Sequence, residues 1–229
     1  MPSFQHRAAD LVELMDDPAC DRELLFRTYA QFAVINPLLS RWRTVYRRHL
    51  RPLMQPGVPF RLLDIGFGGG DIPRRLDRWA RRDGLRLEIT AIDPDPRAAD
   101  FAARAAWPDT ITFRACDTAT LRAEGARFDA VISNAVLHHL NPDAVTRLLE
   151  DSQALATRLV LHNDTVRSAA AYALFSTFIA PWFRRSFTAE DGRRTIRRSY
   201  RPDELLALAP PGWRIEPLFP FRQLAVWEG

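Results

Sequence analysis

Hydrophobic positions follow a helical period in the first quarter of the chain. Within residues 1–55, apolar side chains recur at helical spacing, first over 11–15 and then on a broad face over 21–50. Asn36-Pro37 falls inside the longer pattern and predicts a kink or a break, because proline removes a helical hydrogen bond. A linker rich in proline follows. We therefore expect residues 1–55 to form an N-terminal helical cap on a second unit, residues 56–229.

From residue 60 onward, short apolar runs alternate with helical patterns. Such alternation is typical of the α/β class, in which helices cover both faces of a doubly wound, mostly parallel sheet. The predicted strands are 60–65, 85–92, 111–115, 128–133 and 158–162, and the predicted helices between them are 71–82, 97–106 and 142–155.

The alternation is interrupted after the fifth predicted strand. Residues 166–200 hold an apolar helical pattern and then an Arg-dense polar stretch, and we expect them to form a helical lid over a substrate. Two final strands predict an antiparallel C-terminal hairpin that closes the sheet. We expect the apolar helix over 167–183, the polar stretch over 184–201, a short helix over 202–208, and the strands over 212–220 and 221–227.

Composition places the chain among ordinary globular proteins. Apolar residues make up 47% and charged residues 26% of 229 positions, which excludes a disordered chain. Cys20 and Cys116 are too few for a disulfide framework and favour a reducing compartment. The longest uncharged run, 168–183, has 16 residues, whereas a membrane span needs about 20. We find no transmembrane segment and no signal peptide, and expect a soluble, cytoplasmic protein.

The charge balance changes this picture little. The net charge is +4, and all 32 basic residues are arginine, since the sequence contains no lysine. Codon bias in a GC-rich genome explains this usage at least as well as function does. The basic balance is therefore weak evidence for a nucleic-acid partner.

A glycine-rich loop carries the most specific signal. It follows the strand at 60–65 and reads Asp64-Ile65-Gly66-Phe67-Gly68-Gly69-Gly70, which is D-x-G-x-G-x-G. Glycines there permit a sharp turn and close approach of a ligand to backbone N–H groups. The nicotinamide pattern G-x-G-x-x-G requires a glycine where Asp71 stands, which argues against a nicotinamide enzyme.

Acidic side chains also follow the next two strands. Asp93 ends the second strand, where a carboxylate can accept hydrogen bonds from both hydroxyls of a ribose. Asp117 follows the third strand. Taken alone, it is explained equally well as a ligand contact and as a helix cap.

With this loop and these acids, residues 60–163 resemble the class I S-adenosylmethionine-dependent methyltransferases. The resemblance implies a Rossmann-like sheet and S-adenosyl-L-methionine as cofactor, with the loop wrapping its amino-acid end. Asp64 then holds the ammonium group, Asp93 the ribose and Asp117 the adenine amino group. The expected cofactor-binding residues are Asp64, Gly66, Gly68, Gly70, Asp93, Pro94, Asp117, Thr118 and Asn134. Acids at strand ends can bind Mg²⁺, but the visible acids are thereby assigned to the cofactor, so we assign no metal ligand and leave metal dependence open.

The segment after the fourth strand bears on the acceptor. Enzymes that methylate amino groups of adenine, cytosine or glutamine often carry [N/D]-P-P-[Y/F] there, whereas this chain reads Asn134-Ala135-Val136. The segment is more similar to small-molecule methyltransferases, including those that act in ubiquinone and menaquinone synthesis. The resemblance thus favours a small-molecule acceptor over nucleic acid.

Candidate catalytic residues end two adjacent predicted strands. His138 and His139 follow the fourth strand, and His162 and Asp164 end the fifth. We expect one histidine to act as general base, with Asp164 orienting it. Packing of a histidine against the cofactor and helix capping by Asp164 are the alternatives.

The cap and the lid are expected to enclose an apolar acceptor. Ordinary packing helices or a homodimer interface would give the same pattern. The expected substrate-binding residues are Tyr29, Phe32, Tyr172, Phe175 and Phe178.

Residues 162–200 are similar, in the order HNDxxR…AY…SFTxxDGxxxIRRSY, to a methyltransferase subgroup associated with type III polyketide synthases. That resemblance implies secondary metabolism and a phenolic or polyketide-derived acceptor, and we favour O-methylation. The alternatives are a C-methyltransferase of a quinone precursor, an RNA methyltransferase and a non-catalytic partner protein.

Overall fold

The apolar runs of the sequence form one seven-stranded sheet in the order β3-β2-β1-β4-β5-β7-β6. The computed structural model describes residues 3–183 and 185–229. Strands β1 to β5 pair in parallel, and β7 runs antiparallel to both β5 and β6. The strands are β1 Phe60–Ile65, β2 Leu87–Ile92, β3 Ile111–Arg114, β4 Phe128–Asn134, β5 Ala156–Thr165, β6 Arg214–Leu218 and β7 Arg222–Glu228. The predicted Rossmann-like α/β fold with an antiparallel C-terminal pair is confirmed.

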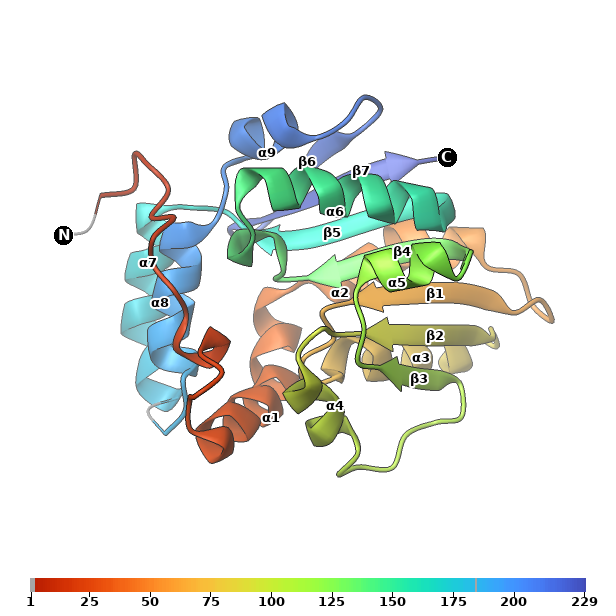
Figure 1. The fold of residues 1–229 in the computed structure, drawn as a ribbon, viewed down its shortest axis with the longest axis horizontal. Helices are drawn as coiled ribbons and strands as arrows, with labels where there is room; N and C mark the ends of the chain where they lie inside the picture. The colour runs from red at the N-terminus through yellow and green to blue at the C-terminus, as the bar shows by residue number, and fades with distance from the viewer. Residues whose placement is uncertain (1–2, 184) are drawn as a thin grey trace.

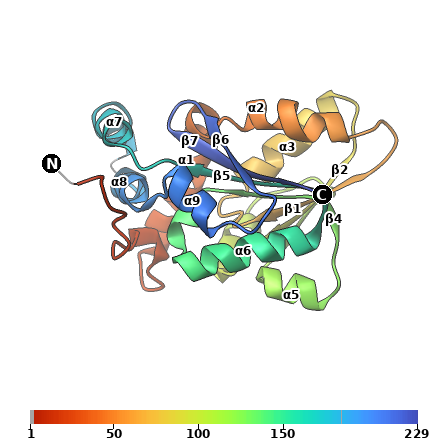
Figure 2. The same cartoon turned by 90° about the horizontal axis from the view of Figure 1, so that it is seen from above.

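Helices cover both faces of the sheet (Figure 2). One layer holds α2 Trp42–Val45, the π-helical turn η2 Tyr46–Leu50 and α3 Asp71–Arg82; the other holds α5 Thr118–Ala123, α6 Pro142–Leu155 and α9 Pro202–Leu208. Because each face packs against helices, the central strands are apolar on both sides, which explains their continuous hydrophobic runs. Leu62 and Ile132 contribute to one core cluster, and Leu63 and Val131 to the other.

A second group of helices lies beyond the carboxyl ends of the parallel strands (Figure 1). It comprises α1 Arg22–Leu39, α7 Ala169–Leu174, the helical turns η5 Phe175–Ile179 and η6 Ala180–Phe183, and α8 Thr188–Arg198, with α4 Pro96–Ala102 beside α1. The N-terminal segment, residues 3–21, runs along α8. Its described residues include one 3-10 turn, η1 Leu14–Asp16. The carboxyl ends of the parallel strands therefore face helices from both the predicted cap and the predicted lid.

Several predicted helices differ from the structure. Most of residues 3–21 is irregular, and the first α-helix begins at Arg22 because the side chain of Asp21 caps it by accepting from two backbone N–H groups. Pro37 lies in the last turn of α1 and does not split it. The stretch predicted as merely polar contains α8.

The predicted cap and lid lie partly outside the described residues, at positions 1, 2 and 184. Their assignment as units separate from the sheet stays a prediction, as does a homodimer interface. Among the described helices, none is both long enough and apolar enough to cross a membrane.

Helix α1 lies directly on the glycine-rich loop. A Cβ atom at Gly69 would lie 2.6 Å from the backbone carbonyl oxygen of Tyr29. We predict that Gly69→Ala lowers the free energy of unfolding by about 1–3 kcal/mol, because the added methyl group forces backbone to move. Chemical denaturation measures this, and a variant as stable as the wild type would contradict the close contact.

Candidate functional site

A cavity of about 840 Å³ lies where the parallel strands end. The glycine-rich loop and the ends of β1, β2 and β4 form one side of it, and α1, η5 and α8 form the other. Parallel sheets place ligand sites at this edge, at the point where the strand order changes direction. Here that point lies between β1 and β4.

Three carboxylates line the cavity near the glycine-rich loop, and Asp64 and Asp71 are buried whereas Asp93 is partly buried. Asp64 is 2% exposed, and its Oδ2 atom has no hydrogen-bond partner among the described residues. Burial raises the pKa of Asp64 well above its usual range, and the negative charges of Asp71 and Asp93 raise it further. A buried carboxylate without a partner is costly, so this part of the cavity favours a cationic ligand group.

The other two carboxylates are better satisfied. Asp71 accepts from Asn36 Nδ2 at 3.0 Å. Asp93 accepts from the backbone N–H of Gly68 at 3.0 Å, so the end of β2 is tied to the loop. Burial raises the pKa of both carboxyl groups, and these hydrogen bonds oppose the effect.

His138 lies between two carboxylates on the other side of the cavity. Its Nδ1 is 2.8 Å from Asp164 Oδ1, and its Nε2 is 3.2 Å from Glu13 Oε1. Burial alone would lower the pKa of His138, but the two carboxylates outweigh this effect and raise the pKa to about 9. Burial would raise the pKa of Asp164, but His138 and then Arg222 hold it down at about 2.

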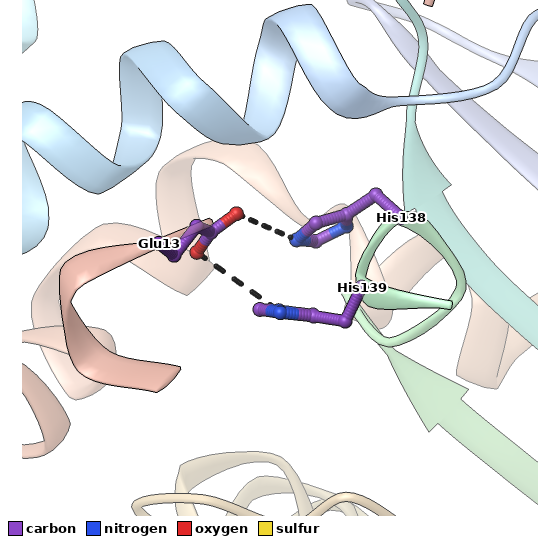
Figure 3. Close-up of side chains that lie close together, drawn as sticks. All are labelled: Glu13, His138 and His139. Atoms are coloured by element: carbon purple, nitrogen blue, oxygen red, sulfur yellow. Dashed lines mark ion pairs between the residues drawn. The ribbon is translucent and has the colours of Figure 1, made fainter. Parts of the chain in front are cut away.

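His139 repeats this arrangement on the neighbouring residue. Its Nδ1 is 2.9 Å from Asp16 Oδ2, and its Nε2 is 3.9 Å from Glu13 Oε2. Figure 3 shows the Glu13 carboxylate pointing at both imidazole rings. The two rings lie 4.2 Å apart between centroids. Glu13, His138 and His139 therefore converge on one point in the wall of the cavity.

Three separate segments hold this cluster in place. Glu13 accepts from Thr195 of α8 at 2.7 Å, and Asp191 of the same helix accepts from the backbone N–H groups of Leu14 and Met15. Arg198 donates to the carbonyl oxygen of His139 at 3.0 Å. The N-terminal segment is thus fastened to α8 at the position where it supplies Glu13.

A buried arginine organises the ends of β4 and β5. Arg222 donates to Asn134 Oδ1 and to Asn163 Oδ1, each at 2.9 Å. Trp42 Nε1 donates to the same oxygen of Asn134 at 2.9 Å. Burial lowers the pKa of Arg222 to about 10, although the nearby Asp164 opposes the effect. The side chain of Asn134 is therefore fixed from two sides where it lines the cavity.

Most of the residues predicted from the sequence line this cavity. On the cofactor side these are Asp64, Gly66, Gly68, Asp93, Pro94 and Asn134, and on the acceptor side Tyr29, Phe32, Phe175, Phe178, His138 and His139. Asp164 does not line the cavity, but it contacts His138 from behind and so positions it.

Four predicted contacts lie elsewhere. Asp117 caps α5 by accepting from Thr120, and Thr118 donates to Asp151 at 2.6 Å, so neither lines the cavity. The structure therefore does not bring Asp117 to the predicted adenine contact. Gly70 faces Trp107 and Phe113 instead of the cavity. Tyr172 packs against Phe4, with ring centroids 5.4 Å apart.

The prediction that His162 reaches the catalytic crevice is wrong. His162 is 0% exposed, stacks on Trp213 with ring centroids 5.7 Å apart, and contacts Ser133 Oγ at 2.7 Å. It faces the core between the sheet and α6, where burial lowers the pKa of its ring to about 3. His162 is thus a neutral core residue.

Sequence reasoning missed Glu13, Asp16 and Asp191. Glu13 interrupts an apolar run from Leu11 to Met15, and an acid in such a run was the one available signal. Its contact with His138 spans 125 positions and depends on how the N-terminal segment folds back.

Comparison with known proteins places these features in a family context. A family model described as a methyltransferase domain matches residues 62–157. The matched residues make up less than half of the chain. A ubiquinone biosynthesis O-methyltransferase of Methylocella silvestris is 38% identical over 88 residues, which cover 38% of this chain and 32% of that protein. The match thus spans about a third of that relative's length.

Solved methyltransferase structures share the fold. The plantazolicin methyltransferase BpumL, in complex with a pentazolic desmethylPZN analog and SAH, matches with a TM-score of 0.59 and 14% identity, over 94% of this chain and 92% of that one. An O-methyltransferase family protein from Burkholderia thailandensis matches with a TM-score of 0.60 and 11% identity, over 88% and 58%. The domain and the fold support an S-adenosylmethionine-dependent methyltransferase.

The carboxylates at the strand ends fit the methyl donor. S-adenosylmethionine carries an ammonium and a sulfonium group, and Asp64, which lines the cavity, has a carboxylate oxygen without a hydrogen-bond partner among the described residues. Asp93 directly follows β2 and lines the same cavity.

We predict that His162→Gln keeps kcat within about threefold of the wild type, whereas His139→Gln lowers it by about 100-fold or more, the usual contribution of a proton-transfer group. The reason is that, of these two histidines, His139 lines the cavity and His162 does not. Rates are measured with a saturating methyl donor and an acceptor found by screening. A loss in His162→Gln as large as that in His139→Gln, in folded protein, would restore His162 to the site.

Proposed function

We propose that this chain transfers a methyl group from S-adenosylmethionine to a hydroxyl group of a small, largely apolar acceptor. The observation that carries the proposal is the division of one cavity into two chemically different parts. Asp64, Asp71 and Asp93 line the part near the glycine-rich loop, aromatic side chains of η5 line the other part, and the Glu13–His138–His139 cluster also lines the cavity.

The chain's residues divide the work between binding and proton removal. Asp64 holds the donor's ammonium group, and Asp93 holds its ribose. The donor supplies an electrophilic methyl group on sulfur, and transfer is an in-line displacement that depends on alignment. Tyr29 and Phe32 of α1 cover the glycine-rich loop and keep water from the reacting atoms.

The acceptor hydroxyl lies at the Glu13–His138–His139 cluster in this proposal. The His139 imidazole accepts the hydroxyl proton, since the raised pKa of His138 keeps that ring protonated at neutral pH, and loss of the proton makes the oxygen nucleophilic. Asp164 and Asp16 each hold one ring by its Nδ1 atom, so that Nε2 of each histidine faces Glu13. This arrangement supports O-methylation, because such a cluster deprotonates a hydroxyl group.

We further propose a phenolic or polyketide-derived acceptor from secondary metabolism. Aromatic side chains that line the acceptor part, including Phe175 and Phe178, support a flat, apolar ring. The methyltransferase of ubiquinone biosynthesis that the chain resembles is named as an O-methyltransferase, which supports the same chemistry. Cys20 and Cys116 are free thiols, which supports a cytoplasmic location.

We predict that S-adenosylhomocysteine binds more tightly as the pH rises through the raised pKa of Asp64. The ligand's ammonium requires the ionised carboxyl, so at lower pH binding must first release a proton. Asp64→Asn should weaken binding by about 10–100-fold, equivalent to about 1.5–3 kcal/mol for a lost charge-assisted bond, and should flatten the pH dependence. Calorimetry between pH 5 and 9 measures both effects.

The same variant tests its own folding. The ligand-free wild type carries a buried carboxyl whose raised pKa destabilises the fold as the pH increases, so Asp64→Asn should unfold at a temperature at or above that of the wild type at pH 8. Unchanged affinity in this folded variant contradicts the ammonium assignment.

We predict that kcat/KM for para-alkyl phenols rises about fourfold per added methylene until the cavity is full, since each buried CH₂ contributes about 0.8 kcal/mol. Phe178→Ala should reduce that increment without changing the affinity for S-adenosylhomocysteine. Steady-state rates along the series measure it. A flat series, with methylated RNA and a steep salt dependence instead, would identify a nucleic-acid substrate.

A further inference from the structure

We propose that Glu13, His138 and His139 bind a divalent transition-metal ion such as Zn²⁺. No spacing pattern in the sequence indicates this site, because two of the ligands are neighbours and the third lies 125 positions away from His138. The ligand atoms of these three side chains all lie within 4.8 Å of one another. The proposed metal would sit in the wall of the acceptor part of the cavity, which all three residues line.

The distances suit a shared ion. Four ligands at about 2.0–2.1 Å from zinc lie about 3.3 Å from each other in a tetrahedron. Glu13 Oε1 is 3.2 Å from His138 Nε2, and Glu13 Oε2 is 3.9 Å from His139 Nε2. A direct charge-assisted hydrogen bond is shorter, at about 2.7–2.9 Å, so neither separation is that of a strong ion pair.

Both histidines are held as metal ligands usually are. In metal sites, the imidazole nitrogen that does not bind the ion donates to a carboxylate, which fixes the ring and its tautomer. Asp164 occupies that position for His138 at 2.8 Å, and Asp16 occupies it for His139 at 2.9 Å. Each Nε2 is thereby left to face Glu13.

The donor set and the open side define the kind of ion. Two imidazoles and one carboxylate suit zinc, cobalt, iron or manganese better than calcium, which takes oxygen ligands. Three protein ligands next to a cavity leave a coordination position for a further group, as in catalytic zinc sites. The alternative occupant of the same space is a proton shared by His138 and Glu13.

A metal ion here deepens the proposed function, on which this step rests: with the ion bound, activation of the hydroxyl passes from the histidine ring to the metal. The acceptor hydroxyl would occupy the open coordination position, and an oxygen bound to a divalent ion loses its proton more readily. The O–H bond breaks, its proton leaves to solvent, and the metal-bound oxygen then forms the bond to the methyl carbon as the carbon–sulfur bond breaks. Metal binding itself requires no methyl donor, so it can be tested separately.

The test is Co²⁺ binding to the full chain without a polyhistidine tag and without methyl donor, followed by visible absorption and by calorimetry with Zn²⁺. We expect one equivalent bound and no thiolate charge-transfer band, which excludes coordination by Cys20. Glu13→Gln and His139→Gln should each weaken binding by more than about 100-fold, and Asp16→Asn by about 10–100-fold, as for other groups that orient a ligand.

His49→Gln is the matched control. His49 also lies near a carboxylate, with Nε2 3.5 Å from Glu216, but this pair is outside the cavity. The His49→Gln variant should bind the metal as tightly as the wild type does. Asp16 is partly exposed, so Asp16→Asn keeps the test valid if Glu13→Gln fails to fold.

Two results would overturn the metal site: no binding below millimolar concentration, or binding that Glu13→Gln, His139→Gln and Asp16→Asn leave unchanged. These outcomes are separable from the proposed function. Methyl transfer that persists in chelator-treated protein, with no metal bound, keeps the function and removes the metal. Metal binding without methyl transfer to any hydroxylated acceptor keeps the metal and removes the function.

Discussion

Buried negative charge without a matching cation is the constraint on which the rest of the site depends. Asp64 lies next to the end of β1 with one carboxylate oxygen that has no partner among the described residues, and Asp71 and Asp93 lie in the same cavity wall. Leaving such charge buried destabilises the ligand-free protein. The arrangement is stable only because rigid parallel strands impose it, and it is useful only to a ligand that brings positive charge. An S-adenosylmethionine site accounts for both.

On the acceptor side, hydrogen bonds between the N-terminal segment and α8 organise the site. The N-terminal segment has little secondary structure of its own, yet it places Glu13 against His138 because α8 holds it by hydrogen bonds to Asp191 and Thr195. Residues near the start of the chain, between β4 and α6, and after β5 thus meet at one cluster (Figure 3). In the proposed function, changes in this segment therefore affect acceptor chemistry, while changes in the carboxylates at the glycine-rich loop affect donor binding.

Predictability from the sequence followed the strength of the local pattern. The strand positions, the loop acids Asp64 and Asp93, and the aromatic residues of α1 and η5 lie where periodicity and spacing indicated. His162 was misplaced because adjacency of β4 and β5 says which strand ends meet, but not which face each side chain takes.

Glu13 escaped prediction for another reason. Residues 3–21 carry no sustained period, so nothing local indicates that the segment returns to the strand ends. Asp117 had two equal explanations, and the structure shows the capping one. Contacts made by tertiary folding of irregular segments are the part that one sequence does not specify.

Hydrogen–deuterium exchange of the chain with and without S-adenosylhomocysteine reports where the ligand binds and requires no acceptor. If the donor binds at the carboxyl ends of the strands, the backbone amides of 64–71 and 93–95 should be protected, with little change in β6 and β7 at the far edge of the sheet. Protection confined to regions outside the cavity, or none at saturating ligand, would contradict it.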